Sequence, residues 1–207
     1  MRSERKQRKA TRAHFNLPTC GAGKMSAPQL LLVIVLFSGC TAAHVERSLT
    51  EDFGSNDSEA QLEFWHALQD RPVASNDEAF HALLLYLNEN EDPASNYQQR
   101  MSWLKSHDML DQKFERPANE GVTRGTLAVA LVKALQIKGG VMMHLLGPTP
   151  RYAIRELQFV GLYPRSSPHQ SFTGAELVSI IGRVEDFQRA HRLDLDPKQL
   201  PEGTTGR

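Results

Sequence analysis

Apolar side chains recur at helical spacing through the middle of the chain. In residues 80–87 they occupy positions i, i+3, i+4 and i+7, the pattern of a helix that turns one face to a core. The groups with this kind of spacing are Leu62, Trp65 and Leu68; Phe80, Leu83, Leu84 and Leu87; and Tyr97, Met101 and Leu104. The pattern predicts an amphipathic helix in each of these stretches.

The second half of the chain continues in the same way. Residues 123–137 are apolar on nearly every face after the first turn, which predicts a helix at the centre of the domain that Gly139 ends. Thr149 and Pro150 predict the start of a short helix. The inward positions of this helix and of the last one are Ile154, Leu157 and Val160, then Leu177, Ile180, Ile181, Val184 and Phe187. Because no segment alternates like a strand, we expect an all-α fold.

Three of the expected helices begin with a similar signal. A hydroxyl stands three residues before a carboxylate in Ser75-Asn-Asp-Glu78 and in Thr173-Gly-Ala-Glu176, a capping box that satisfies free amides of the first turn. The middle copy, which begins at Thr123, keeps only the cap. The three starts are 48 and 50 residues apart. We therefore expect a small helical bundle of about three helix-loop-helix repeats.

The repeat resembles the S-layer homology module, most clearly over residues 96–190. Units of that family place a Thr-Arg-Ala-Glu signature at the start of the main helix, and three units often pack together. The resemblance implies contact with a wall polymer through the signature arginine, which carries over only to Arg124 with its neighbour Thr123. No copy has the whole signature, since the middle one lacks the acid and Gly174 replaces the arginine in the last. A chance likeness between capped helical hairpins is the alternative.

The amino-terminal residues follow a different pattern. Residues 1–40 contain seven Lys or Arg and one acid, and the apolar run of residues 30–37 precedes Ser38, Gly39 and Cys40. This is the layout of a secretory signal. Its eight apolar residues are too few to span a bilayer as a helix, which takes about 20.

Residues 37–40 resemble the lipobox of bacterial lipoproteins, in which small residues precede a cysteine that receives diacylglycerol and becomes the new first residue. The resemblance implies lipid attachment at Cys40, export, and a place on a membrane of the cell envelope. The family prefers Leu where this chain has Phe37. An ordinary cleaved signal and an uncleaved anchor are the alternatives, and Met25 is an alternative start.

These patterns divide the chain into four parts. We expect a leader at 1–39, a lipid-anchored polar tether at 40–57, a helical domain at 58–192 and a tail at 193–207, with leader, tether and tail disordered. Apart from Cys40, the chain has only Cys20 in the leader. The mature domain would then have no internal disulfide, so its stability must come from packing.

Charge and motifs argue against several functions. The formal net charge is zero, and the strongly basic block lies in the leader, which argues against binding of nucleic acid. The eight His residues never occur at spacings that place two on one helix face, so we expect no metal site and no cofactor. Nucleophile-elbow, P-loop and dinucleotide motifs are absent from the sequence, and we expect no catalytic residues.

Two segments are candidate contact surfaces. Residues 139–148 read as an apolar loop in which Met142 and Met143 suit an adaptable contact with another protein. A second loop contains Tyr163, Arg165 and His169, and loops on rigid scaffolds often bind ligands. The alternatives are a loop that merely closes over the bundle and a plain connector.

We therefore expect an exported, lipid-anchored envelope protein whose non-catalytic module binds wall polymer or another envelope component. The alternative is an adaptor that docks a protein partner on residues 141–146. An envelope enzyme is the weakest candidate.

Overall fold

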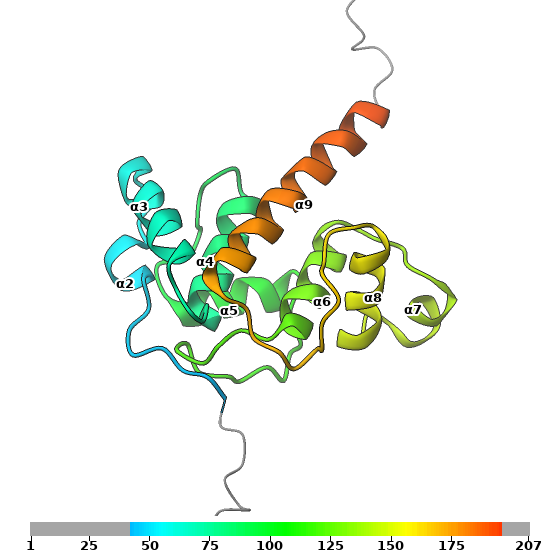
Figure 1. The fold of residues 1–207 in the computed structure, drawn as a ribbon, viewed down its shortest axis with the longest axis horizontal. Coiled ribbons are helices and arrows are strands. Elements are labelled where there is room, and N and C mark those ends of the chain that lie inside the picture. Colours follow the sequence, from blue (N-terminus) through cyan, green and yellow to red (C-terminus); the bar gives the residue numbers. More distant parts are fainter. Residues whose placement is uncertain (1–41, 196–207) are drawn as a thin grey trace, which may run out of the picture. The chain divides into compact units, whose positions relative to one another are not determined.

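The computed structural model describes residues 42–195, with side chains up to His191. Within this range the regular elements are all helices, which confirms the predicted all-α class (Figure 1). Their bounds are α2 (Thr50–Phe53), α3 (Ser58–Gln69), α4 (Asn76–Leu87), α5 (Tyr97–Ser106), α6 (Arg124–Ala134), α7 (Val141–Leu146), α8 (Pro150–Phe159) and α9 (Gly174–Leu195). The predictions for residues 1–41, which include the leader and lipid attachment at Cys40, fall outside the described residues.

The three predicted helix starts are the N-caps of α4, α6 and α9. Ser75 and Glu78 form a complete capping box at α4. Thr123 caps α6 through the amide of Thr126. At α9, the Thr173 side chain accepts a hydrogen bond from the Glu176 amide and the Glu176 side chain accepts one from the Thr173 amide. The repeats therefore consist of the pairs α3–α4, α5–α6 and α8–α9.

The helices of different repeats pack in a closed cycle. The long helix α4 packs against α5 of the second repeat, and α6 packs against α8 of the third. The long helix of the third repeat, α9, returns to pack against α3 of the first. Each short helix thus covers a long helix of another repeat, and all three repeats share one core.

The segments before the capped helices meet one another. Isolated antiparallel bridges pair Ser75 with Gly121 and Thr123 with Ser171. The backbone hydrogen bonds that join the three segments include Ala74 N to Phe172 O, Val122 N to Ala74 O and Arg124 N to Gln170 O. Because these bonds satisfy backbone groups beside the caps, the helix starts are fixed relative to one another.

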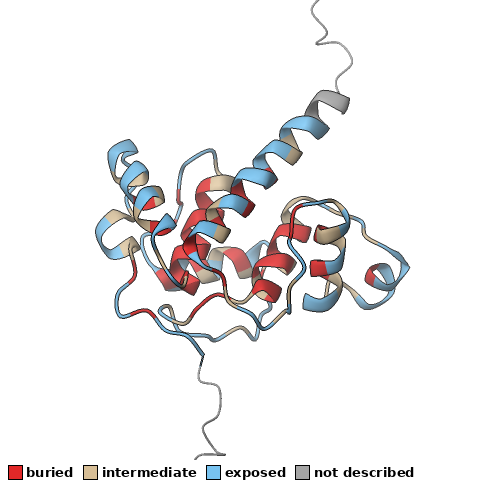
Figure 2. Cartoon of the chain, in the orientation of Figure 1, coloured by how far each residue is buried: buried red, intermediate tan, exposed pale blue. Residues whose placement is uncertain are grey.

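The core is richest around α4 and α6 (Figure 2). The predicted central helix is correct, since Leu127, Ala128 and Leu131 are fully buried. The α3 stripe was predicted less well: Leu68 is buried, but Leu62 is exposed and Phe64 takes the inward position. Phe64 packs edge-on against the His81 ring at a centroid distance of 4.7 Å, a contact that the spacing of Leu62 and Leu68 did not predict.

Four ionisable side chains form a buried cluster between α4 and α5. Arg100 Nη1 donates to Asp77 Oδ1 and Arg100 Nε donates to Asp92 Oδ2, both at 2.6 Å. His81 Nδ1 lies 2.5 Å from the same Asp92 oxygen. Burial raises the pKa of Asp92, but the hydrogen bonds from His81 and Arg100 outweigh it and hold that pKa below its ordinary value.

The expectation of a free tether before α3 is wrong for the described residues of 42–57. Ser48 Oγ donates to Asp77 Oδ2 at 3.0 Å, and the Leu49 amide donates to Glu78 Oε1 at 3.0 Å. Asp77 and Glu78 lie in the first turn of α4 and are buried. Because they are buried, their carboxylate oxygens need hydrogen-bond donors from the protein. The segment supplies these donors and is part of the domain.

Two other boundaries differ from the prediction. Residues 141–146 form the helix α7 where a loop was expected, and α9 continues to Leu195, three residues into the expected tail. The rest of that tail, residues 196–207, is outside the described range. None of the helices within residues 42–195 combines the length and apolar character needed to cross a bilayer.

Candidate binding groove

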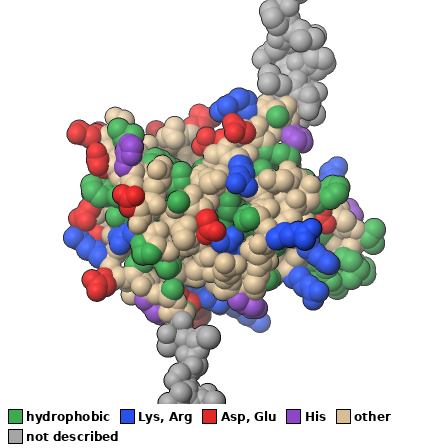
Figure 3. Space-filling view, in the orientation of Figure 1, with side chains coloured by type: hydrophobic (Ala, Val, Ile, Leu, Met, Phe, Trp, Pro, Cys, Tyr) green, Lys and Arg blue, Asp and Glu red, His purple; other side chains and the backbone are tan. Residues whose placement is uncertain are grey.

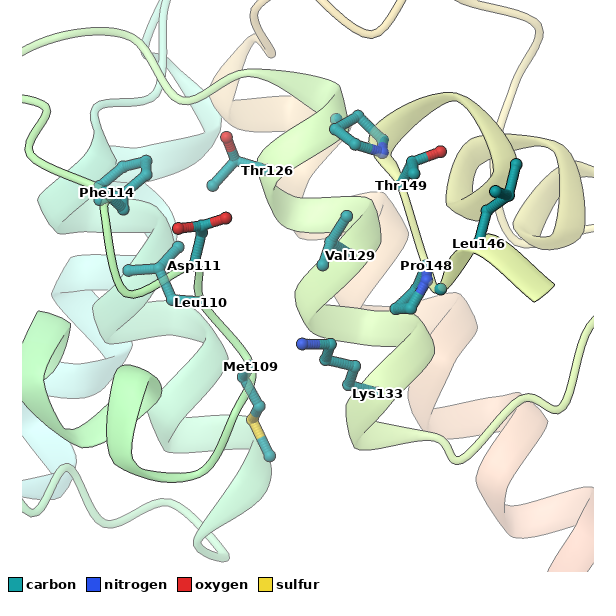
Figure 4. Close-up of a pocket in the computed structure, with 13 residues that line it drawn as sticks. Met109, Leu110, Asp111, Phe114, Thr126, Val129, Lys133, Leu146, Pro148 and Thr149 are labelled. Carbon is teal, nitrogen blue, oxygen red and sulfur yellow. The ribbon is translucent and has the colours of Figure 1, made fainter. Parts of the chain in front are cut away.

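A groove runs along α6 between two loops of the domain (Figure 4). Its floor is the face of α6 that carries Thr126, Val129 and Lys133. One wall comes from the α5–α6 connection, and the other comes from the α7–α8 turn with the start of α8. The wall residues are Met109, Leu110, Asp111 and Phe114 on one side and Leu146, Gly147, Pro148, Thr149 and Pro150 on the other.

Two glycines let the second wall approach α6. A Cβ on Gly125 would lie 2.8 Å from Pro150 Cβ and 3.0 Å from Pro168 O, so any larger residue there would push α8 away. Gly147 has φ +76°, a backbone conformation that favours glycine, and it turns the chain from α7 into α8. The groove width therefore depends on these two positions.

The lining suits a ligand with both apolar and polar faces. The cavity has a volume of about 340 Å³, within the usual range for small-ligand sites. The Phe114 ring, Val129 and the prolines offer apolar surface, while Asp111 and Lys133 supply one charge of each sign. Lys133 Nζ also pairs with the exposed Asp108 at 3.0 Å, so this ammonium is held at the groove. Sugar rings have apolar faces and hydroxyl edges, and such a lining can bind them.

Thr123 and Arg124 lie beside this groove but do not line it. The Thr123 hydroxyl caps α6 and lies 2.8 Å from the Thr126 hydroxyl. Arg124 Nη2 donates to Glu176 Oε1 at 2.6 Å, and its Cζ lies 4.8 Å from the centre of the Phe172 ring. Because the Arg124 side chain is only 3% exposed, contact with a polymer would require this ion pair to open.

The surroundings of Arg124 shift the pKa of its partner, Glu176. Desolvation raises the pKa of Glu176, but hydrogen bonds from Thr173 and Arg124 and the arginine charge outweigh it, so the net shift is downward. Glu176 is therefore held as a carboxylate that both caps α9 and neutralises Arg124. The pair joins the second repeat to the third.

The three residues of the second candidate loop are not brought together as one surface site. Arg165 and His169 are exposed, whereas Tyr163 is buried and packs edge-on against Phe172 at a centroid distance of 5.8 Å. Burial raises the pKa of Tyr163 well above its ordinary value. The positive charge of the nearby Arg124 lowers this pKa, but by a smaller amount. Tyr163 is thus a core residue.

Met142 and Met143 point in different directions from α7. Met143 is buried and lies against Gly139, while Met142 is 46% exposed. The exposed apolar neighbours are Val141, Leu145 and Leu146. The segment keeps an apolar outer surface, as the sequence suggested, but Met143 is not part of it.

The groove residues were missed by sequence reasoning. Phe114 stands among charged residues and Lys133 follows a buried stretch, so neither has a periodic signal. They meet because the cycle of helix contacts brings the α5–α6 connection and the α7–α8 turn to opposite sides of α6. The described part of the chain contains no group of three or more His, Cys, Asp or Glu residues that could hold a metal ion.

Comparison of the chain with models of protein families, with curated proteins and with solved structures gives no match.

Proposed function

We propose that this is a lipid-anchored protein of the cell envelope whose helical module binds wall polymer in the groove along α6. The observation that supports this most is the groove itself, in which the Phe114 ring and Val129 lie near Asp111 and Lys133. Its floor includes Thr126, in the first turn of the helix at whose start the resemblance to S-layer homology modules implies polymer contact. We propose that this groove binds its ligand without catalysis.

A sedimentation assay with purified cell wall tests this function. We expect the full chain to be retained, and the double variant Asp111→Ala and Lys133→Ala to bind more than about tenfold more weakly, since each polar contact contributes about 0.5–1.5 kcal/mol. The matched control replaces Arg183 and Glu185, exposed charges of α9 that do not line the groove. No retention of the full chain, or equal retention of the groove variant, would refute the proposal.

The anchor requires a separate measurement. We propose that Cys40 carries diacylglycerol, and that the two or more acyl chains hold the module durably at a bilayer, because about 0.8 kcal/mol accrues per buried methylene. The intact mass of the native protein should correspond to a chain that begins at Cys40 plus acyl groups. A mature chain with another first residue, or an unmodified Cys40, contradicts the anchor without affecting the groove.

An adaptor that docks a protein on residues 141–146 is the second candidate. The exposure of Val141 at 82% and Leu145 at 76% favours it. Under this function, Leu145→Asp should abolish a co-purifying partner while the melting temperature stays unchanged. Binding to wall polymer would then be unaffected by the same variant.

A further inference from the structure

Large exposed apolar side chains are concentrated on one part of the described domain. Val141, Met142 and Leu145 of α7 are exposed, and Phe159 at the end of α8 is 87% exposed. Among the described residues, the other large apolar side chain that is exposed and does not line the groove is Leu62 on α3. Burial of such residues is favourable by about 25 cal/mol per Å², so a cluster of them indicates a surface that meets something apolar.

Basic side chains border this apolar cluster. Arg151 and Arg155 are exposed and precede Phe159 by eight and four residues, respectively, so the three lie on one face of α8. Figure 3 shows basic and hydrophobic side chains next to one another over α7 and α8. We call Val141, Met142, Leu145, Phe159, Arg151 and Arg155 the α7–α8 patch.

The region around the patch has few negative charges. Residues 133–170 contain five Lys or Arg, and their one acid is Glu156. Glu156 Oε1 accepts a hydrogen bond from the Gly140 amide at 2.9 Å, which ties this carboxylate to the start of α7. The surface therefore presents positive charge around an apolar centre.

We propose that the α7–α8 patch docks on an anionic lipid bilayer, with the apolar residues in the interface and Arg151 and Arg155 at the headgroups. Apolar side chains flanked by Arg and Lys are what such a surface binds, because insertion and attraction to anionic lipid act together. A protein partner fits less well, since the basic side chains that border the apolar centre all have one sign, which matches the uniform charge of an anionic lipid surface. The proposal rests on the proposed function only for the presence of a membrane beside the module.

Docking would orient the domain. An acyl anchor alone keeps the protein near the bilayer but leaves the module free to rotate. A second contact through α7 and α8 fixes which side faces lipid, and Leu146 lies at the border between the patch and the groove. The polymer groove would then open close to the membrane surface.

An environment-sensitive fluorophore tests the contact at a single position. The full chain carries Cys20→Ser and Cys40→Ser, so that no acyl chain can form, and the label is attached through Leu145→Cys. The matched control is the label at Leu62→Cys, an exposed apolar position flanked by Glu59 and Glu63. Vesicles of phosphatidylglycerol and of phosphatidylcholine are compared at low salt.

We expect a blue shift of the label at position 145 with phosphatidylglycerol and none at position 62. Replacing Arg151 and Arg155 by Gln should weaken vesicle binding measured at position 145 by about fivefold per residue.

Absence of a shift at 145 overturns the proposal, as does an equal shift at 62, which would mean adsorption through another part of the chain. An equal shift with phosphatidylcholine overturns the role of charge, and a shift without vesicles that grows with protein concentration assigns the patch to a second copy. Labelled protein that stays unshifted with vesicles but shifts on addition of a purified envelope protein assigns the patch to that partner instead. These outcomes are independent of wall binding and of the mass of the native chain.

Discussion

Arg124 and Glu176 join two repeats through an ion pair whose members differ in their access to water. Arg124 Nη2 lies 2.6 Å from Glu176 Oε1, and the arginine side chain is 3% exposed while that of the glutamate is 41% exposed. The acid can be solvated if it loses its partner, whereas the guanidinium cannot. The two residues should therefore respond differently to substitution.

Glu176→Ala should destabilise the domain more than Arg124→Met. The first change leaves a buried cation unpaired and removes the acceptor for the Thr173 amide, so we expect a loss of about 1.5–3 kcal/mol in the free energy of unfolding. The second leaves an exposed carboxylate and keeps apolar contact with Phe172. Urea denaturation measures both, with Glu185→Ala on the exposed face of α9 as the control. A larger loss for Arg124→Met would mean that the cation–π contact dominates.

Two glycines of α9 should respond with opposite signs. A Cβ on Gly174 would lie 1.6 Å from Leu68 O, so Gly174→Ala must push α9 away from α3, and we expect a loss of about 1–3 kcal/mol. Gly182 is exposed and has nothing within 4 Å of an added Cβ. Gly182→Ala should stabilise the helix by about 0.5–1 kcal/mol. Thermal melting of the two variants checks both signs, and a stable Gly174→Ala protein would contradict the close approach of α3 and α9.

The cluster around Asp92 predicts a loss of stability in acid. The pKa of Asp92 is lower in the folded state than its ordinary value, so the unfolded state binds the proton more readily and the stabilisation is present above the unfolded pKa. It is lost as pH falls from about 4 through the folded pKa. Asp92→Asn should lower stability at neutral pH and flatten the acid dependence. Denaturation curves between neutral and acid pH measure this, and the exposed Asp186→Asn should behave like the unaltered protein.

Substitution of the two neighbouring methionines of α7 should have different effects on stability, because one lies in the core and the other on the surface. Met143 is buried, so Met143→Ala should cost about 2 kcal/mol or more. Met142 is exposed, and Met142→Ala should change the free energy of unfolding by less than about 0.5 kcal/mol. Calorimetry of the single variants is sufficient, and equal effects would mean that α7 does not pack as described.

Local signals predicted the parts of the fold that local chemistry determines. The hydroxyls of Ser75, Thr123 and Thr173 are caps because unpaired amides at a helix start need acceptors, whatever the tertiary context. The buried face of α6 was clear because so few of its residues are polar. Spacing failed at Leu62, where a helix with apolar residues on two faces could turn either one inward.

Long-range chemistry was not visible in the sequence. The segment before α3 looked like a tether because it is polar, yet Ser48 and Thr50 both bond to the buried Asp77. The role of Arg124 could not be predicted either, because its partner is distant in the sequence. The motif shows that an arginine is present but not that Glu176, 52 positions later, pairs with it. The groove was hidden because its walls come from separate segments.

The contact between α3 and α9 also determines how the domain comes apart. In an open stack of repeats the terminal unit can melt while its neighbours survive. Here the first repeat has its helix partner more than 100 residues away, on the last one, so neither end can fray without uncovering the other. This distant pairing makes unfolding all-or-none. It also slows folding, since the chain between α3 and α9 must lose the entropy of loop closure before the contacts between the two helices can form. The end of α3 at Leu68, which lies against Gly174, stays uncovered until α9 has formed.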